Sequence, residues 1–214
     1  SSIIEKAYNL GVTEYIQRPF DAFIVKRRVM NTLVLYANQK KLTNVVVNQV
    51  YEKEENNKIM IGILSSVVGT YNKESREHIL HIRIATQMLL RKLVEKTDAY
   101  PLTESDITLI ATASSLHDIG KVGISKEILN KPTTLTDEEF EIMKSHTLIG
   151  AKMIHSMEYP KDHPLIQTAY EICRWHHERF DGKGYPDGLK GNDIPISAQV
   201  VSIADVFDAL TSTR

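Results

Sequence analysis

The chain has 214 residues, enough for one large domain or for a domain with part of a second. Its formal net charge of −1 excludes a strongly basic surface for nucleic acid or anionic membranes. Cys173 is the only cysteine, which excludes an internal disulfide, predicts a small buried side chain and favours a reducing cytoplasm. No apolar stretch approaches the roughly 18–20 residues that a membrane span requires.

The first 40 residues have the pattern helix, strand, helix. Apolar residues at helical spacing are followed by VTEYI, whose alternation predicts a strand at residues 12–16, and a second helix is expected from Asp21. The segment GVTEYIQRPFD resembles the last third of a response-regulator receiver domain, which implies an upstream sensor kinase as partner. Arg18 stands where that family has a functional lysine. The phosphoacceptor aspartate would lie upstream of Ser1.

Residues 36–68 contain no proline and a single glycine, which predicts one or two long helices. Such a helix is either a solvated spacer or a dimerisation segment. A mostly polar helix of this length rarely stands alone, so we expect a homodimer. The predicted organisation is part of a receiver at 1–40, a helical linker at 41–65 and a second domain at 66–214. Since the chain lacks an initial methionine and stops after an apolar helical pattern, we expect a longer protein.

From residue 66 onward the pattern is helical throughout. Thr103 and Thr136 each precede an apolar periodic run, and an acid follows each three residues later, at Asp106 and Glu139. This is the pattern of a capping box. The predicted fold class is mainly α, an all-helical bundle preceded by a partial α/β segment and a long linker helix.

Several histidines and acids stand where apolar residues would be expected. His117 and Asp118 follow an apolar helix that we expect Gly120 to close; a capping acid beside a half-buried histidine is the alternative to a metal pair. His146 lies on the core face of its predicted helix. Asp205 has apolar neighbours, and a buried carboxylate is costly unless it is paired or coordinated.

Two further pairs of residues belong to these candidate metal ligands. His176 and His177 begin the glycine-rich segment HHERFDGKGYPDG. Glu74 and His78 are four residues apart on one predicted helix face, where Glu74 could instead pair with a surface lysine or arginine. Imidazoles and carboxylates without cysteine suit iron, manganese or zinc in a hydrolytic centre better than a structural zinc site. Carboxylate bridges and several imidazoles imply at least two metal ions.

Three segments resemble the HD-GYP family, a subgroup of HD-type metal-dependent phosphohydrolases. They are HDIGK at 117–121, HHERFDGKGYP at 176–186 and IADVFDAL at 203–210. The resemblance, which begins near residue 66, implies hydrolysis of cyclic di-GMP to pGpG or GMP at a bi- or trinuclear iron or manganese centre. The metal ligands that it implies are His117, Asp118, His146, His176, His177 and Asp205, with Glu74 and His78 adding a third metal.

The same resemblance assigns roles around this centre. It implies that His117, Asp118 and Lys121 act in catalysis. Substrate contacts are expected from Lys121, Lys183, Gly184, Tyr185, Pro186 and Arg214. We expect Gly182 and Gly184 to let the backbone approach the ligand closely. His81 is interpreted as a supporting or surface residue, and Asp208 as a helix-face acid or a supporting partner.

Two alternatives to a cyclic di-GMP phosphodiesterase remain. One is an HD hydrolase that acts on another nucleotide, although the complete GYP loop argues against it. The other is a catalytically weak module that senses cyclic di-GMP or docks a partner. Degenerate members of the family usually lose metal ligands, whereas all eight positions are filled here.

Overall fold

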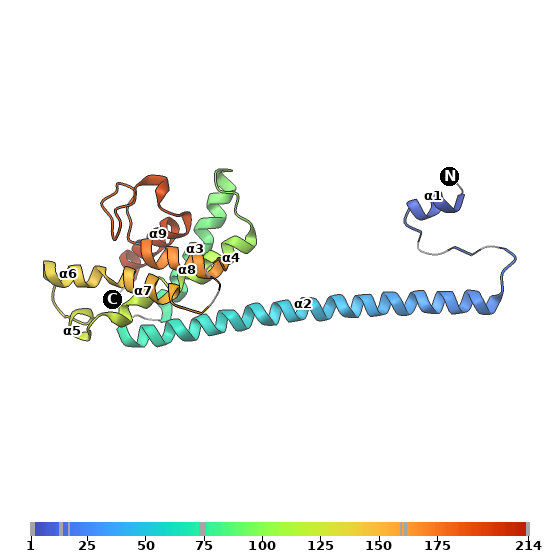
Figure 1. The fold of residues 1–214 in the computed structure, drawn as a ribbon, viewed down its shortest axis with the longest axis horizontal. Coiled ribbons are helices and arrows are strands. Elements are labelled where there is room, and N and C mark those ends of the chain that lie inside the picture. The colour runs from blue at the N-terminus through green and yellow to red at the C-terminus, as the bar shows by residue number, and fades with distance from the viewer. Residues whose placement is uncertain are drawn as a thin grey trace. The chain divides into compact units, whose positions relative to one another are not determined.

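A computed structural model of the chain describes residues 3–12, 15–16, 18–72, 76–158, 160 and 162–212, and these residues are mainly helical (Figure 1). The elements are, in chain order, α1 (Ile3–Asn9), α2 (Ala22–Asn72), α3 (Arg76–Lys96), α4 (Glu104–Ser114), the 3-10 helix η1 (Ile119–Gly123), α5 (Lys126–Leu129), α6 (Asp137–Lys144), α7 (His146–His155), α8 (Pro164–Trp175), the 3-10 helix η2 (Gly191–Asp193) and α9 (Ile196–Thr211). Within the described ranges, no helix combines the length and apolar character needed to cross a membrane.

The chain divides into two compact units, residues 1–55 and 56–214, and α2 contributes to both. In the first unit, none of the described side chains is buried. Asp21 starts α2, since its Oδ1 accepts a hydrogen bond of 2.7 Å from the backbone N–H of Phe23. The division between the units lies inside the predicted linker 41–65. The predicted domain boundaries themselves stay a prediction.

The strand expected at residues 12–16 is wrong for the residues that the structure describes there. Val12, Tyr15 and Ile16 belong to no strand, and no other described segment forms one. A strand is held by hydrogen bonds to a neighbouring strand. Alternation in the sequence therefore does not suffice where the described chain offers no pairing partner. The helices predicted on either side are present as α1 and α2.

The second unit has a core formed by five helices. α3 packs on α4 and α9, while α8 packs on α4, α7 and α9. The buried apolar side chains come from all of them: Ile82, Leu90, Ile107, Ile110, Ala113, Ile154, Ala169, Ile172, Cys173, Val200, Val201 and Ala204. The prediction of an all-helical bundle is confirmed for the described residues of this unit.

Both predicted capping boxes are present. Asp106 N–H donates to Thr103 Oγ1 over 3.2 Å, and Asp106 Oδ2 accepts from Thr103 N–H over 2.8 Å. The equivalent pair of Thr136 and Glu139 starts α6. The helical pattern beyond Thr136 is interrupted at Ser145, whose hydroxyl donates to a backbone carbonyl three residues earlier over 2.6 Å. As a result, a new helix, α7, starts at His146.

Gly120 does not close the helix as expected, because α4 already ends at Ser114 and Gly120 lies within η1. Its role is to let two backbones approach. A Cβ at this position would lie 1.9 Å from His146 O and 2.5 Å from Gly150 N. Only glycine fits here without moving η1 away from α7. The backbone of the HDIGK segment is thereby fixed next to His146.

Gly120→Ala should therefore destabilise the protein by about 1–3 kcal/mol or more, the usual cost of overpacking. Urea unfolding of the two proteins measures this difference. Gly62→Ala is the matched control, since a Cβ at Gly62 in α2 meets no atom within 4 Å. That change should be neutral or stabilising by up to about 1 kcal/mol. Equal effects of the two substitutions would contradict the close approach.

Candidate metal centre

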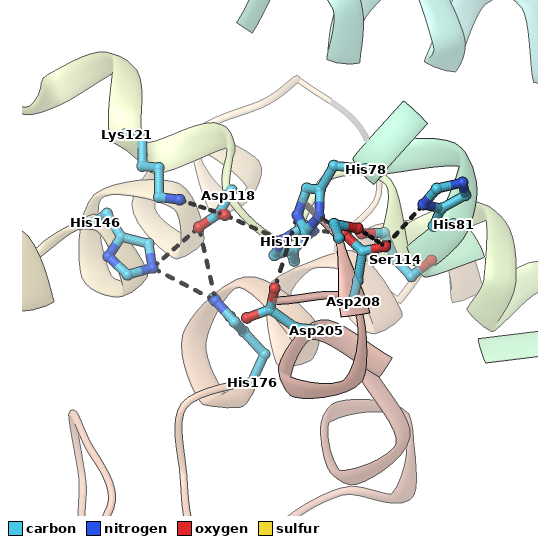
Figure 2. A network of polar contacts seen from close by, with 11 residues as sticks. His78, His81, Ser114, His117, Asp118, Lys121, His146, His176, Asp205 and Asp208 are labelled. Atoms are coloured by element: carbon cyan, nitrogen blue, oxygen red, sulfur yellow. Dashed lines mark hydrogen bonds and ion pairs between the residues drawn. The ribbon is translucent and has the colours of Figure 1, made fainter. Parts of the chain in front are cut away.

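Side chains from several elements of the second unit point toward one another in Figure 2. They are His78 of α3, His117 and Asp118 of the turn after α4, His146 at the start of α7, His176 directly after α8, and Asp205 of α9. His177, the next residue, also places a ligand atom close to those of Asp118, His146 and His176. The potential ligand atoms form two sets, and within each set all atoms lie within 4.8 Å of one another. One set is Asp118 with His146, His176 and His177, and the other is Asp118 with His78 and His117. Asp118 thus belongs to both.

The adjacent residues His117 and Asp118 converge because they lie in a turn and not in a helix. α4 ends at Ser114, and η1 begins only at Ile119. Neighbouring side chains of a helix diverge by about 100°, but a turn is free of this constraint. His117 Nε2 lies 3.0 Å from Asp118 Oδ2.

The orientation of two buried imidazoles is fixed by backbone carbonyls. Nδ1 of His146 lies 2.7 Å from Met143 O, and Nδ1 of His176 lies 2.8 Å from Ile172 O. Since a carbonyl only accepts, each Nδ1 carries the hydrogen. Burial lowers the pKa of both imidazoles, so they are neutral near pH 7. Each Nε2 therefore presents a lone pair, and the two Nε2 atoms are 3.4 Å apart.

These lone pairs face a buried carboxylate. Asp118 Oδ1 lies 3.2 Å from His146 Nε2 and 3.8 Å from His176 Nε2, and it accepts no hydrogen bond from the described residues. Burial raises the pKa of the Asp118 carboxyl, but His117 and Lys121 outweigh burial and lower this pKa well below its ordinary value. Lone pairs and a negative oxygen repel one another inside the protein. A bound cation would turn this repulsion into coordination, so the arrangement fits a metal ion.

The donor set consists of nitrogen and oxygen atoms. Cys173 is fully buried, and its Sγ donates to Leu116 O over 3.1 Å, which confirms the predicted structural role. Burial raises the pKa of this thiol and keeps it protonated. Imidazoles with carboxylates suit iron, manganese or zinc.

The ring of His78 contacts two carboxylates of α9. Its Nδ1 lies 2.7 Å from Asp208 Oδ2, while its Nε2 lies 3.7 Å from Asp205 Oδ1. His81 Nδ1 lies 2.8 Å from the other oxygen of Asp208. Asp208 is buried, whereas the side chain of Asp205 is 21% exposed and faces the cavity. The supporting role considered for Asp208 and His81 therefore agrees with their contacts.

Glu178 is a supporting residue that the sequence interpretation missed. Its side chain is buried, and Oε1 accepts hydrogen bonds from the backbone N–H groups of Asp187 and Gly188 over 2.7 and 3.0 Å. Asp187 is also bound by Arg174 and Trp175 of α8. These contacts fasten the loop that follows His177. The position of this acid, directly after two adjacent histidines, could have identified Glu178 from the sequence.

The glycines of this loop serve its own folding. Gly182 has φ +78°, in the left-handed region that favours glycine. A Cβ at Gly184 would lie 2.3 Å from Arg179 N and 2.4 Å from Glu178 Cα. Gly184 therefore allows the loop to pack on its own backbone, and its expected approach to a ligand stays a prediction.

Two of the predicted substrate contacts line the cavity beside the cluster. Lys121 Nζ lies 2.7 Å from Asp118 Oδ2, and the ring of Tyr185 stacks on His177 with centroids 4.9 Å apart. Burial raises the pKa of the Tyr185 phenol, which stays protonated. The other described candidates, Lys183, Gly184 and Pro186, do not line this cavity. Glu74 and Arg214 lie outside the described residues.

The cavity has a volume of about 1150 Å³ and two kinds of wall. The polar side includes His78, Asp118, His146, His177 and Asp205 of the cluster, whereas His117 and His176 do not line the cavity. Ile84, Met88 and Phe207 contribute apolar surface from α3 and α9. Small-molecule sites usually measure about 300–1,000 Å³. The cavity is therefore at least as large as a usual small-molecule site.

Residues 58–214 match the family described as HD domain. Three curated relatives come from two bacteria. A probable cyclic di-GMP phosphodiesterase of Vibrio cholerae is 35% identical over 97% of this chain and 49% of its own length. A cyclic di-GMP phosphodiesterase of Thermotoga maritima is 33% identical over 100% of this chain and 59% of its own length. A 3'3'-cGAMP-specific phosphodiesterase of V. cholerae is 36% identical over 85% of this chain and 33% of its own length. The chain thus spans well under two thirds of each relative.

The buried imidazoles predict a pH-dependent stability of the metal-free protein. Burial lowers the pKa of His146, His176 and His177, the last to about 4, from an ordinary value of about 6.5. Between these values the unfolded chain binds protons that the folded chain excludes. Acidification from pH 6.5 toward 4 should therefore lower the free energy of unfolding, by up to about 1.4 kcal/mol per pH unit for each histidine.

Urea unfolding of chelator-treated protein at pH 7, 6 and 5 measures this dependence. His177→Gln should reduce the slope by about one proton. Asn192→Gln, at an exposed position without a titratable group, should leave the slope unchanged. A free energy of unfolding that stays constant from pH 7 to 5 would contradict the neutral, buried state of these imidazoles.

Proposed function

Because the chain belongs to the HD-domain family, we propose that it is a metal-dependent phosphodiesterase that hydrolyses cyclic di-GMP to pGpG, GMP or both. The observation that carries this proposal is the place of Asp118 in both sets of potential ligands. A carboxylate shared between two sets suits a bridge between two cations. Paired cations are typical of phosphodiester hydrolysis. The names of the V. cholerae and T. maritima relatives support cyclic di-GMP as the substrate.

We assign the metal ligands as predicted from the sequence. The proposed set is Glu74, His78, His117, Asp118, His146, His176, His177 and Asp205. Its imidazoles and carboxylates favour iron or manganese. When bound, such ions act as Lewis acids and lower the pKa of a coordinated water, which supplies hydroxide at neutral pH. Whether two or three ions bind depends on Glu74 and is decided by the metal content of purified protein.

The remaining residues of the site would bind and orient the substrate. Lys121 holds its ammonium group against Asp118 and can place positive charge beside a phosphate oxygen. The protonated phenol of Tyr185 can donate a hydrogen bond from the cavity wall. The ring of Tyr185 also covers His177, so it shields one side of the cluster from water. His146 and His176 keep their Nδ1 hydrogens on backbone carbonyls, which leaves each Nε2 for coordination.

A second cyclic dinucleotide is a specific alternative. One of the similar V. cholerae proteins is named for 3'3'-cGAMP, which differs from cyclic di-GMP in one base. Both substrates place the same phosphodiester chemistry at the cluster. Rates on the two compounds, compared at equal enzyme concentration, distinguish these alternatives. A module that binds cyclic di-GMP without cleaving it would show affinity for the nucleotide and no turnover.

Asp118→Ala tests the proposed reaction. Loss of a bridging carboxylate should lower cyclic di-GMP hydrolysis by several orders of magnitude and reduce the bound metal, while circular dichroism shows the helices intact. Product chromatography and metal analysis of anaerobically purified protein are the measurements. Asp193→Ala, an exposed carboxylate of η2, is the control and should retain full activity. Normal turnover by the Asp118 variant would refute the shared-carboxylate centre.

We also propose that the chain acts as the output part of a response regulator and forms a parallel homodimer through α2. The receiver resemblance of the first 40 residues supports the former. Leu42, Val46 and Val50 support the latter, since these apolar side chains recur every four residues and are 65%, 50% and 54% exposed. A cytoplasmic location stays a prediction.

Leu42→Glu combined with Val46→Glu should convert a dimer into a monomer, because two like charges would face each other across the contact. Light scattering at high micromolar concentration reports the mass. Asn44→Glu with Asn48→Glu adds the same charge at other positions of α2 and should leave the dimer intact. A wild-type protein that is monomeric under these conditions contradicts the assembly.

A further inference from the structure

Asp208 lies between two histidines of a neighbouring helix (Figure 2). Its Oδ2 is 2.7 Å from His78 Nδ1, and its Oδ1 is 2.8 Å from His81 Nδ1. Ser212, one turn further along α9, donates its hydroxyl to the same Oδ1 over 3.0 Å. Both carboxylate oxygens are therefore engaged by side chains of α3 and the end of α9.

The two histidines differ in their surroundings. The side chain of Asp208 is 8% exposed and that of His78 is 11% exposed, whereas His81 is 53% exposed. Asp208 accepts hydrogen bonds from His78, His81 and Ser212. It is thus a buried acceptor at the inner end of a short hydrogen-bonded chain.

A carboxylate acceptor at Nδ1 decides which nitrogen of His78 carries the hydrogen in the neutral ring. Because Asp208 accepts from Nδ1, the lone pair remains on Nε2. That Nε2 lies 3.7 Å from Asp205 Oδ1, and His78 belongs to the ligand set of His117 and Asp118. The lone pair of His78 is therefore directed toward the cluster and away from Asp208.

His78 is held differently from the other histidines of the cluster for which an Nδ1 partner is described. His117, His146 and His176 each place Nδ1 within 2.9 Å of a backbone carbonyl three or four residues earlier. Such a partner comes with the local turn or helix. The partner of His78 is 130 residues away in the sequence, on α9. The orientation of His78 therefore depends on the packing of α3 against α9.

We propose that Asp208 is a positioning residue that fixes His78 as a ligand for one cation of the cluster. Hydrogen bonds from His81 and Ser212 hold Asp208 in place for this role. The inference rests on the proposed metal centre and extends it to residues outside the ligand set. A carboxylate at the far nitrogen fixes the ring and raises its basicity as a ligand. Loss of such a partner typically weakens metal binding by about 10- to 100-fold.

Asp208→Leu keeps a similar side-chain shape and removes both acceptors. Titration of the chelator-treated full chain with Mn²⁺ should then show one site weakened by about 10- to 100-fold, with the remaining sites little changed. Asp208→Asn retains one acceptor oxygen and should give an intermediate affinity. Asp193→Asn changes the same charge at an exposed position and should match the wild type.

The tautomer of His78 supplies a readout that needs neither metal nor substrate. Nitrogen-detected NMR of the metal-free protein should assign the hydrogen to Nδ1 in the wild type and show a shift toward Nε2 in Asp208→Leu. A mere loss of packing would change the unfolding temperature without changing this ratio. Unchanged Mn²⁺ affinity at every site, or an unchanged tautomer, in a folded Asp208→Leu protein would overturn the proposal.

If Asp208→Leu does not fold, the double variant His81→Leu with Ser212→Ala decides the question. It removes two of the three donors that hold Asp208 and leaves His78 in place. The weakest Mn²⁺ site should lose affinity several-fold, and unchanged affinity would refute the proposal. Hydrolysis enters neither readout, so a wild-type protein without cyclic di-GMP turnover would refute the proposed function alone.

Discussion

The fold of the second unit is organised around one unfavourable contact: a buried carboxylate that faces imidazole lone pairs. Asp118 Oδ1 lies 3.2 Å from His146 Nε2 and 3.8 Å from His176 Nε2, and both rings are neutral because burial lowers the pKa of each. Without a cation this arrangement costs free energy. The apolar packing of the surrounding helices must therefore compensate for this cost, which a bound cation would relieve.

Helix ends and close backbone contacts hold these donors in place. His146 begins α7 because the helix before it is interrupted at Ser145, and His176 follows the last residue of α8. Gly120 allows η1 to pack directly on the backbone at His146. Backbone carbonyls three or four residues earlier orient the rings of His117, His146 and His176. The ring of His78 is oriented instead by a carboxylate 130 residues away in the sequence.

A second layer of carboxylates connects the centre to its surroundings. Asp208 joins α3 to α9, and Glu178 holds the loop on which Tyr185 covers His177. Each of these acids is buried and accepts at least two hydrogen bonds. Asp208 and Glu178 thus hold the residues around the cluster in place beside a cavity of about 1150 Å³.

The sequence by itself determined the helical class and both capping boxes, because periodicity and caps are local signals. Polar residues in apolar runs pointed to part of the cluster, and the family resemblance implied the full ligand set. The sequence also predicted a strand at residues 12–16 that the described residues do not form, since pairing depends on a partner that alternation does not reveal. Glu178, which holds the loop after His177, was missed. Which oxygen of Asp208 meets which histidine was decided only by the tertiary structure, because that contact joins residues 130 positions apart through the packing of two helices.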